Sequence, residues 1–337
     1  MKVLIDLAGI PFHLAHGGAR TQILGTRAGL EAHGVEVEFA RWWDQDQKGD
    51  VIHIFGVPKA DYLKYAARKG VPVINTTLFT AACNRSDRRL SLQGLGIGLA
   101  RRMPQVPPFS VLRSGLDRSA FALCTRNVVG LAAEVEVLKR AYQVPEEQIR
   151  VVPLALPDAF HGVTPGERSS PFLITTGTIT ARKRSLELAR LAHEQQVPIC
   201  FVGKPYDETD PYWHAFRERI DDKWVRHVPH TESVDEMIRL LRESRGFVLG
   251  SDYENWCLSA HEAAACGLPL LLPDQRWSRE RFGDQVRYFP PGAVSGGGAA
   301  LKEFYGEAPG LAPPGVEHLR WADVGRMMIG IYEEVMR

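Results

Sequence analysis

The stretch GFVLGSDYENWCLSAHEAAACGLPLLLP, Gly246–Pro273, contains two short apolar runs with a run of small residues between them. Continuous apolar runs of this length are typical of strands buried on both faces of a parallel sheet. The small residues at about 257–266 favour a buried helix, and parallel neighbours need such a crossover. Two carboxylates, Glu254 and Glu262, stand at the start of this helix and within it. The stretch therefore predicts a strand–helix–strand unit with two acids beside it.

The same alternation continues in both directions from this unit, which predicts an α/β protein with parallel sheets. A segment with four prolines, 153–171, interrupts it and predicts a domain boundary. We expect an irregular Gly/Pro-rich segment at 290–314 before a last helix. The expected strands lie at 2–7, 35–40, 51–55, 71–75, 127–131, 172–177, 199–204, 224–228, 246–250 and 268–272. The expected helices lie at 19–33, 185–195, 211–221, 233–243, about 257–266 and 318–336.

Length and composition describe an ordinary globular chain. Its 337 residues suggest about two domains. The formal net charge of +1 gives no argument for nucleic acid as a partner. Five dispersed cysteines without metal-site spacing indicate reduced thiols, and no signal peptide or apolar run long enough for a bilayer is recognised. We therefore expect a cytoplasmic protein.

The two acids allow two interpretations from residue pattern alone. A helix N-terminus following a strand suits a phosphate, and carboxylates accept hydrogen bonds from the paired hydroxyls of sugars and ribose. Alternatively, Ser259 caps the helix and Glu262 completes an S-x-x-E capping box. Both interpretations fit the spacing.

Several segments resemble retaining GT-B glycosyltransferases of glycosyltransferase family 4. YENWCLSAHEAAACGLPLLL is similar to the acid–seven residues–acid segment of that family. GGARTQI is similar to its N-terminal glycine loop, LITTGTITARKRSLELARLA to its second-domain opening, and WADVGRMMIGIYEEV to its closing helix. The resemblance implies a GT-B fold with two Rossmann-like doubly wound domains facing across a cleft. It implies an acceptor-side domain at 1–155, a nucleotide-sugar domain at 156–315, and a helix at 316–337 that packs back on the first domain.

The resemblance also implies roles for individual residues. Glu254 would contact the donor sugar and Lys183 would neutralise the diphosphate, and these two are the catalytic candidates. Glu262 would bind ribose hydroxyls. Thr178 stands after Gly177 where the family commonly has an arginine, and Arg182 or Arg184 would replace that cation. The full set of donor-binding candidates is Glu262, Gly17, Gly18, Gly177, Thr178, Arg182, Cys257, Leu258, Val228 and His230.

Acceptor contacts are expected in the first domain, where the candidates are His53, Asn75 and Thr77. From its place within VIHIF alone, His53 is more typical of a buried histidine bonded to the backbone, and only the resemblance implies an acceptor role. The segment 84–104, with five arginines around an apolar centre, indicates either a helix with a basic end or an amphipathic surface that meets anionic lipid. Trp42 and Trp43 could stack on a sugar or pack at the edge of a domain, and the sequence assigns them neither role.

The resemblance implies retaining transfer of a sugar from a nucleotide diphosphate sugar to a hydroxyl, in polysaccharide, glycolipid or other glycoconjugate synthesis. Lysine, arginine and a helix N-terminus can stabilise the leaving diphosphate, so no metal and no cofactor are expected. Expected partners are the donor, a sugar, lipid-linked or small-molecule acceptor, and the inner membrane face as a peripheral contact. Two alternatives remain: a GT-B nucleotide-sugar epimerase, and a non-catalytic nucleotide-sugar-binding protein.

Overall fold

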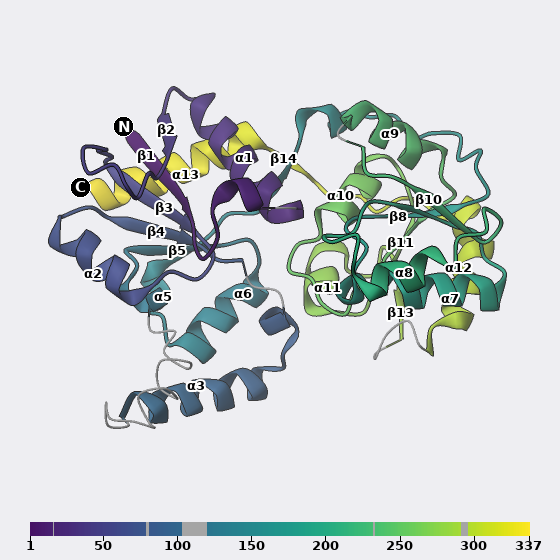
Figure 1. Ribbon diagram of the computed structural model, residues 1–337, viewed down its shortest axis with the longest axis horizontal. Helices are drawn as coiled ribbons and strands as arrows, with labels where there is room; N and C mark the ends of the chain where they lie inside the picture. Colours follow the sequence, from purple (N-terminus) through teal and green to yellow (C-terminus); the bar gives the residue numbers. More distant parts are fainter. Residues whose placement is uncertain (16, 79–80, 103–119, 232, 291–295) are drawn as a thin grey trace. The chain divides into compact units, whose positions relative to one another are not determined.

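The computed structural model describes residues 1–15, 17–78, 81–102, 120–231, 233–290 and 296–337. The chain forms two compact units, which Figure 1 shows with every element labelled where there is room. Unit 1 consists of residues 1–155 and 319–337, and unit 2 of residues 156–318. Each unit contains its own parallel sheet, so each is described by itself.

The sheet of unit 1 has the strand order β2-β1-β3-β4-β5-β6, and every neighbouring pair is parallel. This order reverses direction at β1, as in doubly wound folds. Apolar side chains from β1, β3 and β4 form a core with residues of the last helix of the chain. The strands are β1 (Lys2–Leu7), β2 (Glu36–Phe39), β3 (Val51–Phe55), β4 (Val73–Thr76), β5 (Arg126–Val129) and β6 (Ile149–Val151).

The last helix, α13 (Trp321–Met336), packs against α1 (Gly17–Glu31), and Figure 1 shows these yellow and purple helices side by side. Glycines permit the close approach. A Cβ added at Gly29 would lie 2.0 Å from the carbonyl oxygen of Trp321, and one added at Gly325 would lie 2.2 Å from that of Gly29. Within the described ranges, the other helices of unit 1 are α2 (Ala60–Arg68), α3 (Asp87–Arg102), α5 (Ala120–Leu123) and α6 (Ala132–Glu136), followed by a π-helical turn at Val137–Ala141.

The sheet of unit 2 has the order β10-β9-β8-β11-β12-β13, again with parallel neighbours. The buried apolar side chains of its strands pack against helices of unit 2 and form a core of their own. The strands are β8 (Leu173–Thr176), β9 (Ile199–Val202), β10 (Val225–Val228), β11 (Phe247–Val248), β12 (Leu270–Pro273) and β13 (Arg287–Phe289). The helices are α7 (Ser185–Gln195), α8 (Pro211–Arg217), α9 (Val234–Glu243), α10 (Leu258–Ala265), α11 (Arg276–Phe282) and α12 (Gly298–Glu307).

The structure confirms the two parallel sheets and each predicted strand, with small shifts of the ends. It corrects one segment. The Gly/Pro-rich stretch after 290 was expected to be irregular, yet α12 lies within it. Leu301 and Phe304 of this helix are buried in the core of unit 2, so apolar packing outweighs the weak local propensity of the glycines. No helix in the described ranges is both long and apolar enough to span a bilayer.

Candidate active site

Two neighbouring strands of unit 2, β8 and β11, end in loops that meet at the carboxyl edge of the sheet. The loop after β8 begins at Gly177, whose φ of +140° favours glycine. It then turns through a short 3-10 helix at Ala181–Lys183, where the Thr180 side chain accepts a hydrogen bond from the backbone N–H of Lys183. Arg184, with φ of 55°, leads directly into α7. This turn carries Arg182 and Lys183 to the edge of the sheet.

The loop after β11 brings Glu254 to these two cations. The Nζ of Lys183 lies 2.6 Å from Oε1 of Glu254, and Nη1 of Arg182 lies 2.7 Å from the same oxygen. The hydroxyl of Ser251 donates a third hydrogen bond to Oε1, at 2.9 Å. The Glu254 side chain is 8% exposed and that of Lys183 is 14% exposed. The site is therefore a nearly buried carboxylate shared by two cations.

Further contacts fasten the two loops to each other. The backbone N–H of Asp252 donates to the carbonyl of Arg182 at 2.9 Å, and Nε of Arg184 donates to the Asp252 carboxylate at 2.6 Å. The Nε2 of Gln275 donates to the carbonyls of Ser251 and Asp252, at 3.1 and 2.7 Å. Sequence reasoning missed Ser251 and Gln275. Nothing in the local pattern could have found Gln275, because its partners lie more than twenty residues away.

The electrostatics of this cluster favour an anion. Burial raises the pKa of Glu254, but the Lys183 ammonium and the Arg182 guanidinium outweigh it and hold that pKa below its ordinary value. Burial lowers the pKa of Lys183, and its pairing with Glu254 outweighs this effect. The acid and both cations are therefore charged near neutral pH. Two positive charges share one negative charge, so the cluster keeps one positive charge that a phosphate could neutralise.

Helix α10 follows this loop and settles the capping-box alternative. The helix begins at Leu258 with Cys257 as its N-cap, in the left-handed conformation at φ of 59°. Ser259 is therefore inside the first turn, and its hydroxyl lies 3.4 Å from Sγ of Cys257. The capping box is wrong for this helix because Ser259 stands two positions beyond the cap. Cys257 and Leu258 instead provide the helix start that leads away from Glu254.

Glu262 lies one turn further along α10. Burial raises the pKa of its carboxyl to about 7, although the Lys183 charge acts in the opposite direction. Within the described part of the chain, no group hydrogen-bonds or ion-pairs with this carboxyl. An acid placed in this way retains its full capacity to bind hydroxyl groups. The Lys183 charge acts on both the Glu262 and the Glu254 carboxyl, so the two acids lie near the same lysine.

The neighbouring strands of unit 2 carry the remaining donor candidates. Gly203, after β9, approaches Gly177 so closely that a Cβ added there would lie 1.9 Å from the Gly177 carbonyl oxygen. Val228 ends β10, where its carbonyl accepts from the Gly203 N–H, and His230 is exposed just beyond. Thr178 is half-buried between Gly177 and the turn at Lys183. The carboxyl ends of β10, β8 and β11 thus hold the donor candidates of unit 2, and β9 lies between β10 and β8.

Candidates in unit 1 divide into two groups. Gly17 and Gly18 do not form a loop before the helix, as their resemblance implied, but are the first residues of α1 itself. A Cβ at Gly18 would meet no other atom within 4 Å, so the backbone there is open to approach. The acceptor candidates are different, because all three are buried.

His53 is fully buried, with Nδ1 2.7 Å from the Tyr332 hydroxyl and Nε2 2.7 Å from the Thr76 hydroxyl. Asn75 is also fully buried, and Thr77 is 3% exposed. These residues therefore cannot touch an acceptor in this conformation. His53 instead joins β3 and β4 to α13, as its buried interpretation expects, except that its partners are side chains and not backbone.

The sequence contains one Asp-x-Asp stretch, Asp44–Asp46. It follows β2 in unit 1, where the Asp44 carboxylate accepts a hydrogen bond from Nε of Arg41 at 2.9 Å. Asp44 is thus engaged in an ion pair. In the described ranges, no three His, Cys, Asp or Glu side chains are grouped to hold a metal ion.

Comparisons with known proteins place this geometry in a fold class. No family model matches the chain, and no curated protein matches it in sequence. Among solved structures, sucrose-phosphate synthase of Thermosynechococcus elongatus matches with a TM-score of 0.64 at 14% identity, over 100% of this chain and 96% of that one. Anabaena HepE, solved with UDP-glucose, matches with a TM-score of 0.59 at 13% identity, over 99% and 98%.

TarM matches with a TM-score of 0.55 at 12% identity over 85% of this chain, which spans only 51% of the TarM chain. Identities this low establish the fold alone. These neighbours are GT-B glycosyltransferases. The chain therefore has the GT-B fold, with a parallel-sheet domain in each unit.

Proposed function

We propose that this protein is a glycosyltransferase that moves a sugar from a nucleotide diphosphate sugar to a hydroxyl group, with retention at the anomeric carbon. One observation carries the proposal. Lys183 and Arg182 share the buried Glu254 carboxylate at the carboxyl edge of a parallel sheet, with Glu262 on the next helix. The GT-B fold supports it, since the structural neighbours include a protein solved with UDP-glucose.

In the proposed reaction the bond from the anomeric carbon to the diphosphate oxygen breaks, and a bond to the acceptor oxygen forms on the same face. The acceptor's proton passes to the leaving diphosphate. Lys183 and Arg182 stabilise the charge that develops on the departing oxygens, as preorganised cations do. Glu254 accepts hydrogen bonds from the donor sugar while it holds both cations in place. Glu262 binds the ribose hydroxyls.

Metal independence belongs to the same proposal, because two cations already supply the charge that a metal would bring. The proposed metal-free donor site needs no cofactor other than the donor itself. We assign Gly177 and Thr178, which lead into the Lys183 turn, and Cys257 and Leu258, which start α10, to the walls of the phosphate site. Val228 and His230 would line the nucleobase end.

A peripheral membrane contact is also part of the proposal, and α3 supports it. Leu92, Leu95 and Leu99 are 67%, 64% and 62% exposed, and the spacing of three and four residues puts them on one stripe of the helix. Arg88 and Arg102 extend this stripe and are also exposed. The apolar residues on the other side, Leu90 and Ile97, are buried against the π-helical turn. The outward stripe therefore combines apolar and basic groups, as anionic lipid surfaces require.

The donor site is tested by thermal shift against nucleoside diphosphates and their sugars, UDP-glucose among them. A ligand that binds only the folded protein raises the melting temperature. Lys183→Ala should abolish the shift, whereas Lys302→Ala should keep it, because Lys302 is an exposed residue of α12. Transfer to an acceptor, followed by NMR of the product anomer, tests retention. Inversion would overturn the retaining mechanism, and equal shifts in both variants would overturn the site.

A further inference from the structure

The carboxyl edge of the unit 1 sheet exposes apolar and aromatic side chains. Adjacent parallel strands β2, β1 and β3 end at this edge. The residues that follow them include Trp42 and Trp43, which are 66% and 82% exposed. Tryptophan is mostly buried in folded proteins, so two consecutive exposed indoles are unusual. Ile10, Leu14 and Val57, at 44–51% exposed, follow β1 and β3 in the same region of the fold.

A carboxylate lies directly beside the first indole. Nε1 of Trp42 is 3.2 Å from both carboxylate oxygens of Asp6, which is the next-to-last residue of β1. Tyr62, from α2, lies on the same side, with its ring 5.9 Å from that of Trp42. A carboxylate has about four acceptor positions, and the Trp42 indole donates a single hydrogen, shared between the two oxygens. Asp6 therefore keeps capacity for a further donor.

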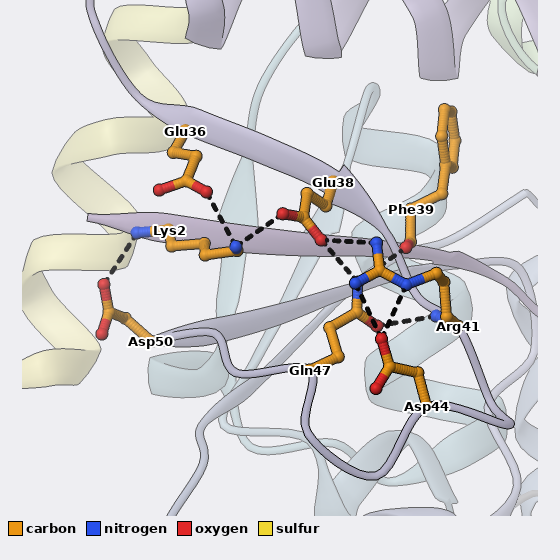
Figure 2. Close-up of polar contacts among 8 residues, drawn as sticks. All are labelled: Lys2, Glu36, Glu38, Phe39, Arg41, Asp44, Gln47 and Asp50. Carbon is orange, nitrogen blue, oxygen red and sulfur yellow. Dashed lines mark hydrogen bonds and ion pairs between the residues drawn. The ribbon is translucent and has the colours of Figure 1, made fainter.

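Arg41 and Asp44, the residues before and after the tryptophans in the chain, belong to a network of ion pairs and hydrogen bonds that Figure 2 shows. Nη1 of Arg41 donates to Glu38 at 2.9 Å, and its Nε donates to Asp44 at 2.9 Å. The backbone N–H of Arg41 donates to Gln47, whose amide returns hydrogen bonds to Glu38 and to the Phe39 carbonyl.

Lys2 anchors the same network to β1 through ion pairs of 2.7 and 2.6 Å with Glu36 and Glu38. Residues immediately before and after Trp42 and Trp43 are thus tied to the sheet. A fixed loop loses little conformational entropy when a ligand binds, which favours a preformed binding surface over a flexible one.

We propose that Trp42, Trp43 and Asp6 form a carbohydrate-binding subsite, which takes a pyranose ring of the acceptor. The C–H face of a pyranose carries partial positive charge and fits the negative face of an indole. A ring hydroxyl donates to the Asp6 carboxylate, which the Trp42 indole N–H holds in place. An apolar ligand would gain nothing from that carboxylate, so a sugar is the occupant that uses both groups. This subsite replaces the buried His53, Asn75 and Thr77, and its role in transfer rests on the function proposed above.

The test uses the full chain and methyl glycosides of glucose, galactose, mannose and N-acetylglucosamine, followed by tryptophan fluorescence and ligand-observed NMR. We expect Trp42→Ala and Asp6→Asn to weaken binding of the recognised glycoside about tenfold or more. The control is Trp224→Ala, a tryptophan that precedes β10 in unit 2. Melting curves of Trp42→Ala should stay near those of the unchanged protein, since that side chain is mostly exposed. Trp43→Ala, the more exposed variant, provides a second reading if Asp6→Asn folds poorly.

Three outcomes would overturn the subsite. No binding of any methyl glycoside at tens of millimolar would overturn the subsite, as would equal affinities in all variants. Binding of octyl glycosides alone would also overturn it, because the alkyl chain and not the sugar would then be recognised. The donor is measured separately. Glycoside binding that depends on Trp42, in a protein that binds no nucleotide sugar, would refute glycosyl transfer and leave the carbohydrate subsite standing.

Discussion

The Nζ of Lys183 and the Oε1 of Glu254 lie 2.6 Å apart in a nearly buried ion pair, which Arg182 joins from a second side at 2.7 Å. The acid proposed to grip the donor sugar is therefore also the acid that positions both cations. A substitution at Glu254 therefore has two effects. It removes a hydrogen-bond acceptor for the sugar, and it leaves more of the positive charge of Lys183 and Arg182 for the diphosphate.

We expect Glu254→Gln to lower kcat by roughly ten- to a hundredfold, since a lost charge-assisted hydrogen bond costs about 1.5–3 kcal/mol. Affinity for nucleoside diphosphate alone should stay the same or increase, because Lys183 and Arg182 lose a competing anion. Asp252→Asn is the control in the same loop, as Asp252 pairs with Arg184 instead. Steady-state kinetics and nucleotide titration measure both quantities. A loss of nucleotide affinity in Glu254→Gln with kcat unchanged would contradict this division of roles.

Glu262 should make donor affinity depend on pH near neutrality. Burial raises the pKa of its carboxyl to about 7, and the ionised form accepts ribose hydroxyls better. Affinity for UDP-glucose should therefore rise about tenfold between pH 6 and pH 8, as the ionised fraction does. Glu262→Gln should bind more weakly and show a flat profile. A nucleotide sugar is the right probe because its diphosphate is doubly esterified and does not titrate in this range. An identical slope in the variant would remove Glu262 from the site.

The same carboxyl gives a stability signature without donor. Its folded pKa is raised above the unfolded value of about 4.3, so the folded protein holds the proton longer as pH rises. Between these two pKa values the unfolded state binds fewer protons, and stability falls with increasing pH. We expect the unchanged protein to lose about 1–3 kcal/mol relative to Glu262→Gln between pH 4.5 and 7.5. Denaturant unfolding at several pH values measures this difference, and parallel curves would contradict it.

Chelation tests the metal-free mechanism. If Lys183 and Arg182 stabilise the leaving diphosphate, donor turnover should persist in excess EDTA. Complete loss on chelation, with rescue by magnesium or manganese, would show that these two cations do not suffice.

Much of the fold was predictable because buried parallel strands can be recognised in the sequence as continuous apolar runs. Lys2–Leu7 and Ser185–Gln195 were predicted with the bounds that the structure has. Helix α12 was not predicted because its glycines have low helix propensity. Its formation depends on burial of Leu301 and Phe304 in a core that strands distant in the sequence build.

The candidate site was predictable only where strand ends point to it. Lys183 and Glu254 follow neighbouring strands, and the structure brings them together. The apolar run around His53 indicated its burial, but its hydrogen bond to Tyr332, 279 residues away, has no local signal in the sequence. Likewise, the pairing of Asp6 with Trp42 requires the strand order of the finished sheet.

The crossing of α1 and α13 should tolerate no side chain at Gly29. A Cβ there would lie 2.0 Å from the Trp321 carbonyl oxygen, and the backbone cannot yield as a flexible side chain could. We expect Gly29→Ala to cost about 1–3 kcal/mol of unfolding free energy, as overpacking does. Gly330→Ala, on α13 with nothing within 4 Å, should instead be neutral or stabilising by about 0.5–1 kcal/mol. Thermal or urea unfolding compares the two. Equal stabilities would show that the helices do not cross as closely as described.

The exposed stripe of α3 predicts binding to anionic vesicles. Changing Leu92, Leu95 and Leu99 to serine removes the apolar part of the stripe while Arg88 and Arg102 keep their charge. We expect the unchanged protein to float with vesicles that contain phosphatidylglycerol, and not with pure phosphatidylcholine, because basic groups need an anionic surface. The triple variant should lose most of this binding.

The control is Leu123→Ser, at a 48% exposed leucine of α5, which should retain the binding. Since these leucines face away from Leu90 and Ile97, the triple variant should melt like the unchanged protein. Flotation of the triple variant at the unchanged level, or binding to neutral vesicles alone, would assign this stripe to something other than an anionic membrane.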